Sequence, residues 1–144
     1  MKNLFLLLTV LCLFCSCSKD DVSADISVDG TSENNEKPNS NLIGKWKWTK
    51  STGGIGGIEI TPASTNKVIV LEISNDRIKV VEDGKTISDE SYTIQSKKSI
   101  YGGQKEMIVY EKNAPLYQSY EIKESELLIN DECFDCFTHS YIKK

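Results

Sequence analysis

Hydrophobic and polar residues alternate along short segments from residue 42 onward, which is the pattern of half-buried β-strands. The clearest segment runs from Leu42 to Thr49. A strand there turns Trp46 and Trp48, the only tryptophans of the chain, to the same face. Two indole rings on one face expose a large apolar surface unless other residues pack on them, so we expect both rings to be buried inside a β-structure.

Seven later segments also read as strands, and turn residues separate them: 67–74, 77–82, 85–95, 105–111, 116–122, 126–130 and 137–142. Asp83-Gly84 is typical of a type I′ hairpin turn. Residues 61–66 read as a loop or one short helical turn, and we expect the polar middle of 85–95 to bulge. Eight short strands predict an all-β fold, a small up-and-down antiparallel barrel that closes on itself.

The alternation also predicts which side chains face the interior of this barrel. They are Trp46, Trp48, Ile69, Leu71, Ile78, Val80, Tyr92, Ile94 and Tyr141. Such an interior suits a filled core or a site for a small hydrophobic or amphipathic molecule. The candidate ligand-binding residues are Trp46, Trp48, Tyr92, Tyr141 and His139, although we expect Trp46 to be structural in either case.

A glycine-rich connection, residues 51–58, follows the first strand. It has neither the Gly-Lys-Ser/Thr ending of a phosphate loop nor the glycine spacing of a dinucleotide site. We therefore expect a mobile lid or a bulged strand end at the barrel mouth, near the ligand.

The N-terminal residues 1–16 read as a signal peptide, because an apolar run of eleven residues follows Lys2. The run is too short to cross a bilayer as a helix. Phe14-Cys15-Ser16-Cys17 resembles the lipobox of bacterial lipoproteins, which implies that Cys17 is acylated. The alternative is a secreted protein with incidental cysteines in its signal peptide.

Residues 18–21, Ser-Lys-Asp-Asp, resemble the signal that sends some Gram-negative lipoproteins to the outer face of the outer membrane. The alternative is a solvated charge run. We expect acyl chains on Cys17 to anchor the protein in the outer membrane, displayed on the cell surface.

Charge is unevenly distributed along the chain. Residues 18–41 carry six acidic and two basic side chains and no aromatic residue, so residues 17–41 read as the lipidated cysteine and a flexible acidic tether. Residues 42–144 carry fifteen acidic and fourteen basic side chains. A nearly neutral domain lacks the clustered basic face that a nucleic-acid partner requires.

Two cysteines, Cys133 and Cys136, follow the N-terminal region. We favour a local disulfide. Three alternatives stay open: a redox pair, reduced thiols, or half of a zinc site completed by His139 and a carboxylate such as Asp131 or Asp135. No metal or cofactor is expected.

No motif of an enzyme appears around His139, the single histidine. We interpret it as a hydrogen-bonded core or rim residue. The adjacent acids Asp89-Glu90 and Asp131-Glu132 point to opposite faces of a strand, so we interpret them as solvated turn and edge charges rather than a glycosidase pair. The sequence therefore predicts a protein that is not an enzyme.

Residues 42–144, 103 of 144, resemble the small lipocalin-like domains of Gram-negative lipoproteins. The resemblance rests on the Gly-x-Trp-x-Trp opening at Gly44, the Ile60-Thr61-Pro62 segment, the Asp-Gly turn and the closing strand with Thr138–Tyr141. It implies a monomeric barrel, closed at one end by Trp46, that binds a small hydrophobic or amphipathic ligand. The alternative is a filled barrel that binds a protein or glycan through its loops.

Overall fold

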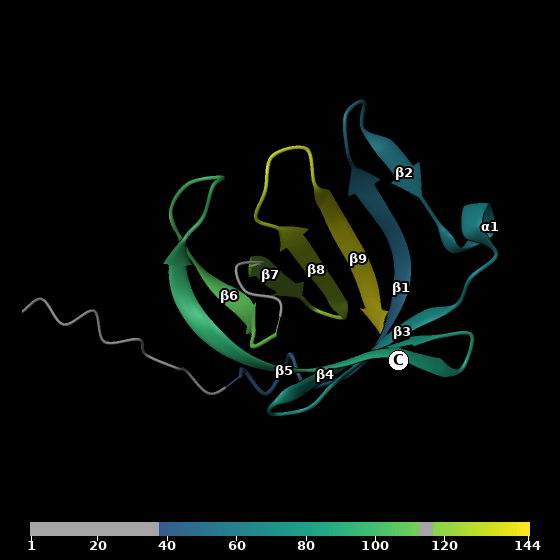
Figure 1. Cartoon of the computed structure of the whole chain (residues 1–144), viewed down its shortest axis with the longest axis horizontal. Helices are drawn as coiled ribbons and strands as arrows, with labels where there is room; N and C mark the ends of the chain where they lie inside the picture. The colour runs from purple at the N-terminus through teal and green to yellow at the C-terminus, as the bar shows by residue number, and fades with distance from the viewer. Residues whose placement is uncertain (1–37, 113–116) are drawn as a thin grey trace, which may run out of the picture. The chain divides into compact units, whose positions relative to one another are not determined.

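A computed structural model describes residues 38–112 and 117–144 (Figure 1). The expected signal peptide, Cys17 and most of the expected tether lie outside these residues. The described part contains no helix that is long and apolar enough to cross a membrane. Its elements are β1 (Gly44–Gly53), β2 (Ile58–Ile60), α1 (Pro62–Thr65), β3 (Ile69–Ile73), β4 (Arg77–Glu82), β5 (Lys85–Lys98), β6 (Gln104–Tyr110), β7 (Tyr117–Lys123), β8 (Glu126–Asp131) and β9 (Phe137–Lys143).

The sheet closes on itself as an antiparallel barrel. Each of β3 to β9 pairs with its neighbour in the chain, β1 pairs with β3, and β9 returns to pair with β1. Figure 1 shows β9 and β1 side by side at this closure. The predicted eight-stranded up-and-down barrel is confirmed, and its strands are β1 and β3 to β9.

The region after Trp48 differs from the sequence prediction. Strand β1 continues to Gly53 and returns through a ninth strand, β2, which pairs with residues 51–53 alone. The register of β1 against β9 shifts between Trp48 and Lys50, so Thr49 is a bulge. An extra residue reverses the alternation beyond it, which a pattern of strict period two cannot anticipate.

Two local predictions about turns hold. Asp83 and Gly84 have φ of 50° and 80°, the positive values that a type I′ turn needs. Residues 62–65 form the single helical turn α1, which Thr61 caps through the backbone N–H of Ser64. Strand β5 also bulges, but at Ile87 near its start, whereas the polar middle from Ser88 to Ser91, where we expect the bulge, pairs regularly with β4.

The core fills the barrel around Trp46, which is fully buried. Its indole Nε1–H donates to the carbonyl of Leu42 at 2.8 Å, and the Lys143 ammonium lies 4.9 Å from the ring centroid. Most of the predicted interior residues are buried there, while Ile69 and Val80 pack half-buried against the cluster. The buried members are Leu42, Trp46, Trp48, Leu71, Ile73, Ile78, Tyr92, Ile94, Ile108, Leu127, Ile129 and Tyr141.

A second buried region lies on the outer face of the barrel. Ile108 belongs to the core, so its neighbour Met107 points outward, yet Met107 is 1% exposed. The β5–β6 loop covers the neighbouring surface: Ser99 in that loop is buried, and its hydroxyl donates to the Glu132 carboxylate after β8. The long β5–β6 hairpin therefore bends over its neighbouring strands.

Candidate functional site

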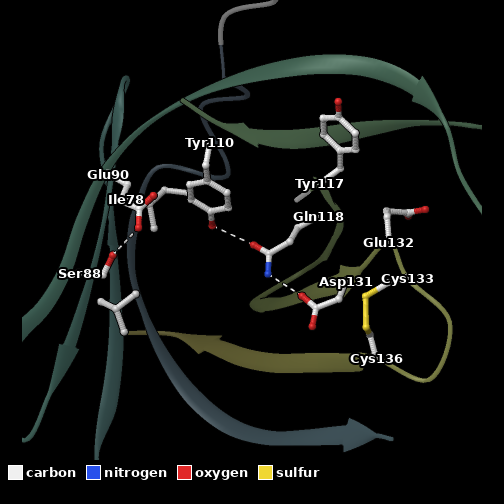
Figure 2. A pocket seen from close by; sticks show the side chains of 11 residues that line it. Ile78, Ser88, Glu90, Tyr110, Tyr117, Gln118, Asp131, Glu132, Cys133 and Cys136 are labelled. Carbon is white, nitrogen blue, oxygen red and sulfur yellow. Dashed lines mark hydrogen bonds between the residues drawn. A yellow bond between two sulfur atoms is a disulfide. The ribbon is translucent and has the colours of Figure 1, made fainter. Parts of the chain in front are cut away.

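A cavity of about 380 Å³ opens at the end of the barrel where β8 ends and β9 begins. Five consecutive strands and the loop between β8 and β9 supply its walls. Figure 2 shows Ile78 and Glu90 on one side and the Cys133–Cys136 disulfide on the other. The lining residues are Ile78, Val80, Ser88, Glu90, Tyr110, Tyr117, Gln118, Asp131, Glu132, Cys133 and Cys136.

A chain of hydrogen bonds crosses this cavity (Figure 2). The Tyr110 hydroxyl donates to Oε1 of Gln118 at 2.8 Å, and Nε2 of Gln118 donates to Oδ1 of Asp131 at 2.7 Å. Cross-strand register explains the second contact, because Gln118 and Asp131 are directly paired on β7 and β8. The amide of Gln118 is thereby fixed in one orientation.

The chain continues from Asp131 toward β1. Its Oδ2 lies 3.4 Å from Nε2 of His139, and Nδ1 of His139 lies 2.7 Å from the Ser51 hydroxyl. That hydroxyl oxygen also accepts the indole N–H of Trp48 at 2.9 Å. With Nε2–H donating to Asp131, Nδ1 is the acceptor for the Ser51 hydroxyl. Every polar side-chain atom in this row of hydrogen bonds therefore has a partner.

The bulge at Thr49 produces the contact between Ser51 and His139. These residues are paired across β1 and β9 beyond the bulge, whereas Trp48 pairs with Tyr141 before it. If the same sequence paired regularly beyond Trp48, Lys50 would lie opposite His139 and would turn its long cationic side chain inward. The bulge thus places a small hydroxyl next to the imidazole ring.

Asp131 is ionised at neutral pH because its hydrogen bonds outweigh its partial burial. Burial raises the pKa of Asp131, but the bonds from His139 and Gln118 lower it, and the net pKa lies below the ordinary 3.8. Burial, and then the negative charges of Glu90 and Asp131, raise the pKa of Tyr110 well above 10.0. The phenol therefore stays protonated as the donor to Gln118.

Ser51, His139 and Asp131 have the residue types of a catalytic triad, and sequence reasoning did not bring them together. A nucleophile must reach its substrate, yet Ser51 is 6% exposed and its oxygen already holds the Trp48 N–H. The arrangement is therefore suited to orienting Asp131 at the cavity, not to attacking a bound molecule. Within residues 38–112 and 117–144, no group of three or more His, Cys, Asp or Glu is placed to hold a metal ion.

The rim of the cavity is tied together by the loop after β8. Cys133 and Cys136 form a disulfide there, the pairing that the sequence favours. The Glu132 carboxylate accepts the Ile100 backbone N–H at 2.9 Å, and the Tyr101 hydroxyl donates to the Cys133 carbonyl at 3.3 Å. On the other side, the Gly54 N–H donates to the Cys136 carbonyl at 3.3 Å. Three loops thus meet beside the opening.

The five candidate ligand-binding residues from the sequence do not line this cavity. Four of them, Trp46, Trp48, Tyr92 and Tyr141, are buried in the core, and the Tyr92 hydroxyl donates to the Ser74 carbonyl at 2.7 Å. His139 lies behind Asp131, as the hydrogen-bonded residue that its isolation in the sequence suggests. The Gly53–Gly57 segment also lies outside the lining.

Sequence reasoning missed the polar residues that do line the cavity. The sequence prediction that Asp131 and Glu132 are solvated charges is wrong, because both are half-buried and hydrogen-bonded. Alternation does place Gln118 and Tyr110 on the same face as core residues of their strands. A polar residue in phase with a core face was the available signal.

A second hollow, of about 480 Å³, lies where β9 ends and β1 begins. Its lining is mostly polar and includes Asn41, Glu106 and Lys143. The Lys143 ammonium is engaged there by the Asn41 carbonyl and the Trp46 ring. Trp46 closes the barrel behind it, so this end is a polar surface depression over the core.

No family model, curated protein or solved structure matches this chain.

Proposed function

We propose that this protein binds a small hydrophobic or amphipathic molecule in the cavity between β4 and β8, as a lipocalin-like domain anchored to the outer membrane through Cys17. The observation that carries the proposal is the cavity itself: about 380 Å³ inside a barrel small enough for side chains to fill. Apolar walls with a few fixed polar groups are typical of small-molecule sites.

A plug variant tests this proposal. Ser88 lines the cavity from β5, whereas Ser96 on the same strand is exposed and lies outside the lining. We expect S88W to remove binding and S96W to keep it. The full chain carrying C17A, which avoids the lipid, would be titrated with fatty acid, sterol, haem and bile-acid-like compounds while its melting temperature is followed.

A ligand at a hundred times its dissociation constant adds about 2.7 kcal/mol to the stability of the folded state. A bound compound therefore raises the melting temperature of the parent and of S96W, but not that of S88W. No shift with any compound, or equal shifts in all three proteins, would contradict binding in the cavity.

One observation favours a second function, a surface module that binds a protein or glycan. Three loops that meet at the cavity rim expose large apolar side chains: Ile55 is 87%, Phe134 82% and Tyr101 59% exposed. Exposed apolar groups gathered at one end of a molecule mark interaction surfaces. A partner that binds there would be lost in I55S or F134S and retained in S88W, which separates the two functions.

A further inference from the structure

The charged groups that line the cavity all have one sign. Glu90, Asp131 and Glu132 contribute carboxylates, and no lysine or arginine lines the cavity. The carboxylate of Glu132 is bound by Ser99 and Ile100 in the β5–β6 loop, and Figure 2 shows it turned away from Asp131. The carboxylates of Glu90 on β5 and Asp131 on β8 contribute the charge inside the cavity.

The negative charges of both carboxylates influence the same group inside the cavity, the Tyr110 hydroxyl. Tyr110, whose ring lies between them in Figure 2, has its pKa raised by the charges of Glu90 and Asp131 in addition to burial. An anionic ligand would meet this negative field in a mostly apolar, poorly screened site. A cationic group would meet it with favourable sign.

The hydrogen-bonding capacity of the site points in the same direction. The Tyr110 hydroxyl is used on Gln118, and one N–H of the Gln118 amide is used on Asp131. Asp131 receives three donors, from Gln118, His139 and the Phe137 backbone N–H, and an ionised carboxylate can accept about four. The site offers acceptors, which an ammonium group with three N–H donors complements.

We propose that the ligand is a small amphipathic amine, with its ammonium group at Asp131 and its apolar part against Ile78, Val80 and the disulfide. This inference rests on the proposed binding function and names its ligand class. The cavity defines the site, and the carboxylates define the charge that the ligand carries. Glu90, hydrogen-bonded by Ser88 at 3.1 Å, contributes to the field from the opposite wall.

Three probes of one shape test the proposal: n-octylamine, n-octanol and n-octanoate, titrated calorimetrically into the full chain carrying C17A at neutral pH. We expect the amine to bind at least about tenfold more tightly than the alcohol, and the carboxylate most weakly. D131N should weaken amine binding about tenfold and leave alcohol binding unchanged. E126Q, which alters an exposed carboxylate on the same strand, is the matched control and should change neither.

The outcomes separate this inference from the proposed function. Equal binding of amine and alcohol, or amine binding unaffected by D131N, would overturn the amine assignment while the cavity remains a binding site. Binding of no probe, together with no melting shift from the larger panel, would overturn both. If D131N does not fold, E90Q takes its place, and amine binding unchanged in E90Q counts against the proposal.

Discussion

At the scale of single residues, the end of β8 shows how a neighbour in space decides the role of a side chain. Asp131 and Glu132 are adjacent and point to opposite faces, as strand geometry requires. One carboxylate is held by Gln118 and His139 at the cavity, and the other by Ser99 and Ile100 outside the barrel. Two residues of similar chemistry thereby have different roles, one facing the cavity and the other holding the β5–β6 loop.

Asp131 makes the stability of the fold dependent on acid. Its pKa is lower in the folded protein than the ordinary 3.8, so its contribution to stability is present above about pH 4 and is lost as the pH falls through the folded value. We expect D131N to be less stable than the parent at neutral pH, with the difference shrinking below about pH 4.

Urea unfolding of both proteins at a series of pH values measures this difference. E126Q, which removes an exposed carboxylate from the same strand, serves as the matched control. A constant difference between D131N and the parent across the acid range would contradict the prediction.

At the scale of elements, Gly53 is a point of close approach between β1 and the backbone that leaves the disulfide loop. A Cβ atom at this position would lie 2.1 Å from the Cys136 carbonyl oxygen and 2.7 Å from the Phe137 Cα. Both atoms belong to backbone that is held by strand pairing and the disulfide, so neither can yield without moving β9.

G53A is therefore expected to destabilise the protein by about 3 kcal/mol or more, from overpacking together with backbone strain. G56A, at φ +107° with no atom within 4 Å of the added Cβ, bears the strain alone and should cost about 1–2 kcal/mol. Chemical denaturation of the two variants gives the comparison. Equal losses would show that the close approach at Gly53 contributes nothing.

The alternation of hydrophobic and polar residues predicts the bounds of some strands and not of others. The bounds of β4, Arg77–Glu82, follow directly from alternation ended by Ser-Asn-Asp and Asp-Gly turns. The extension of β1, its bulge and the strand β2 do not, because they depend on which residues β9 and β1 present to each other. The fold class was predictable from local signals, whereas the contact of Ser51 with His139 was not.

At the scale of the whole molecule, uneven side-chain size explains why a small barrel is filled at one end and open at the other. Trp46 and Leu127 are fully buried and fill one end of the interior. Near the other end, the cavity lining includes the small side chains of Val80 and Ser88. An eight-stranded barrel has room for a ligand only where such residues leave it.

The expected membrane anchor is a property of the full chain. C17A should move the protein from the membrane fraction to the soluble fraction and abolish metabolic labelling with palmitate, because the acyl chains supply the membrane affinity. C15A, two residues away, is the matched control and should leave both unchanged. Protease added to intact cells should remove the parent protein, and complete protection would count against display at the cell surface.

The run of contacts from the cavity to Trp48 has a practical consequence. Only His139 and Ser51 stand between the carboxylate of Asp131 and the indole N–H of Trp48. Neutralising or displacing that carboxylate alters the polarity that the excited indole senses, while Trp46 contributes a constant background from its sealed position. Trp48 is thus an intrinsic fluorophore connected to the cavity by hydrogen bonds, and its emission spectrum tests, without any added dye, whether a compound occupies the cavity.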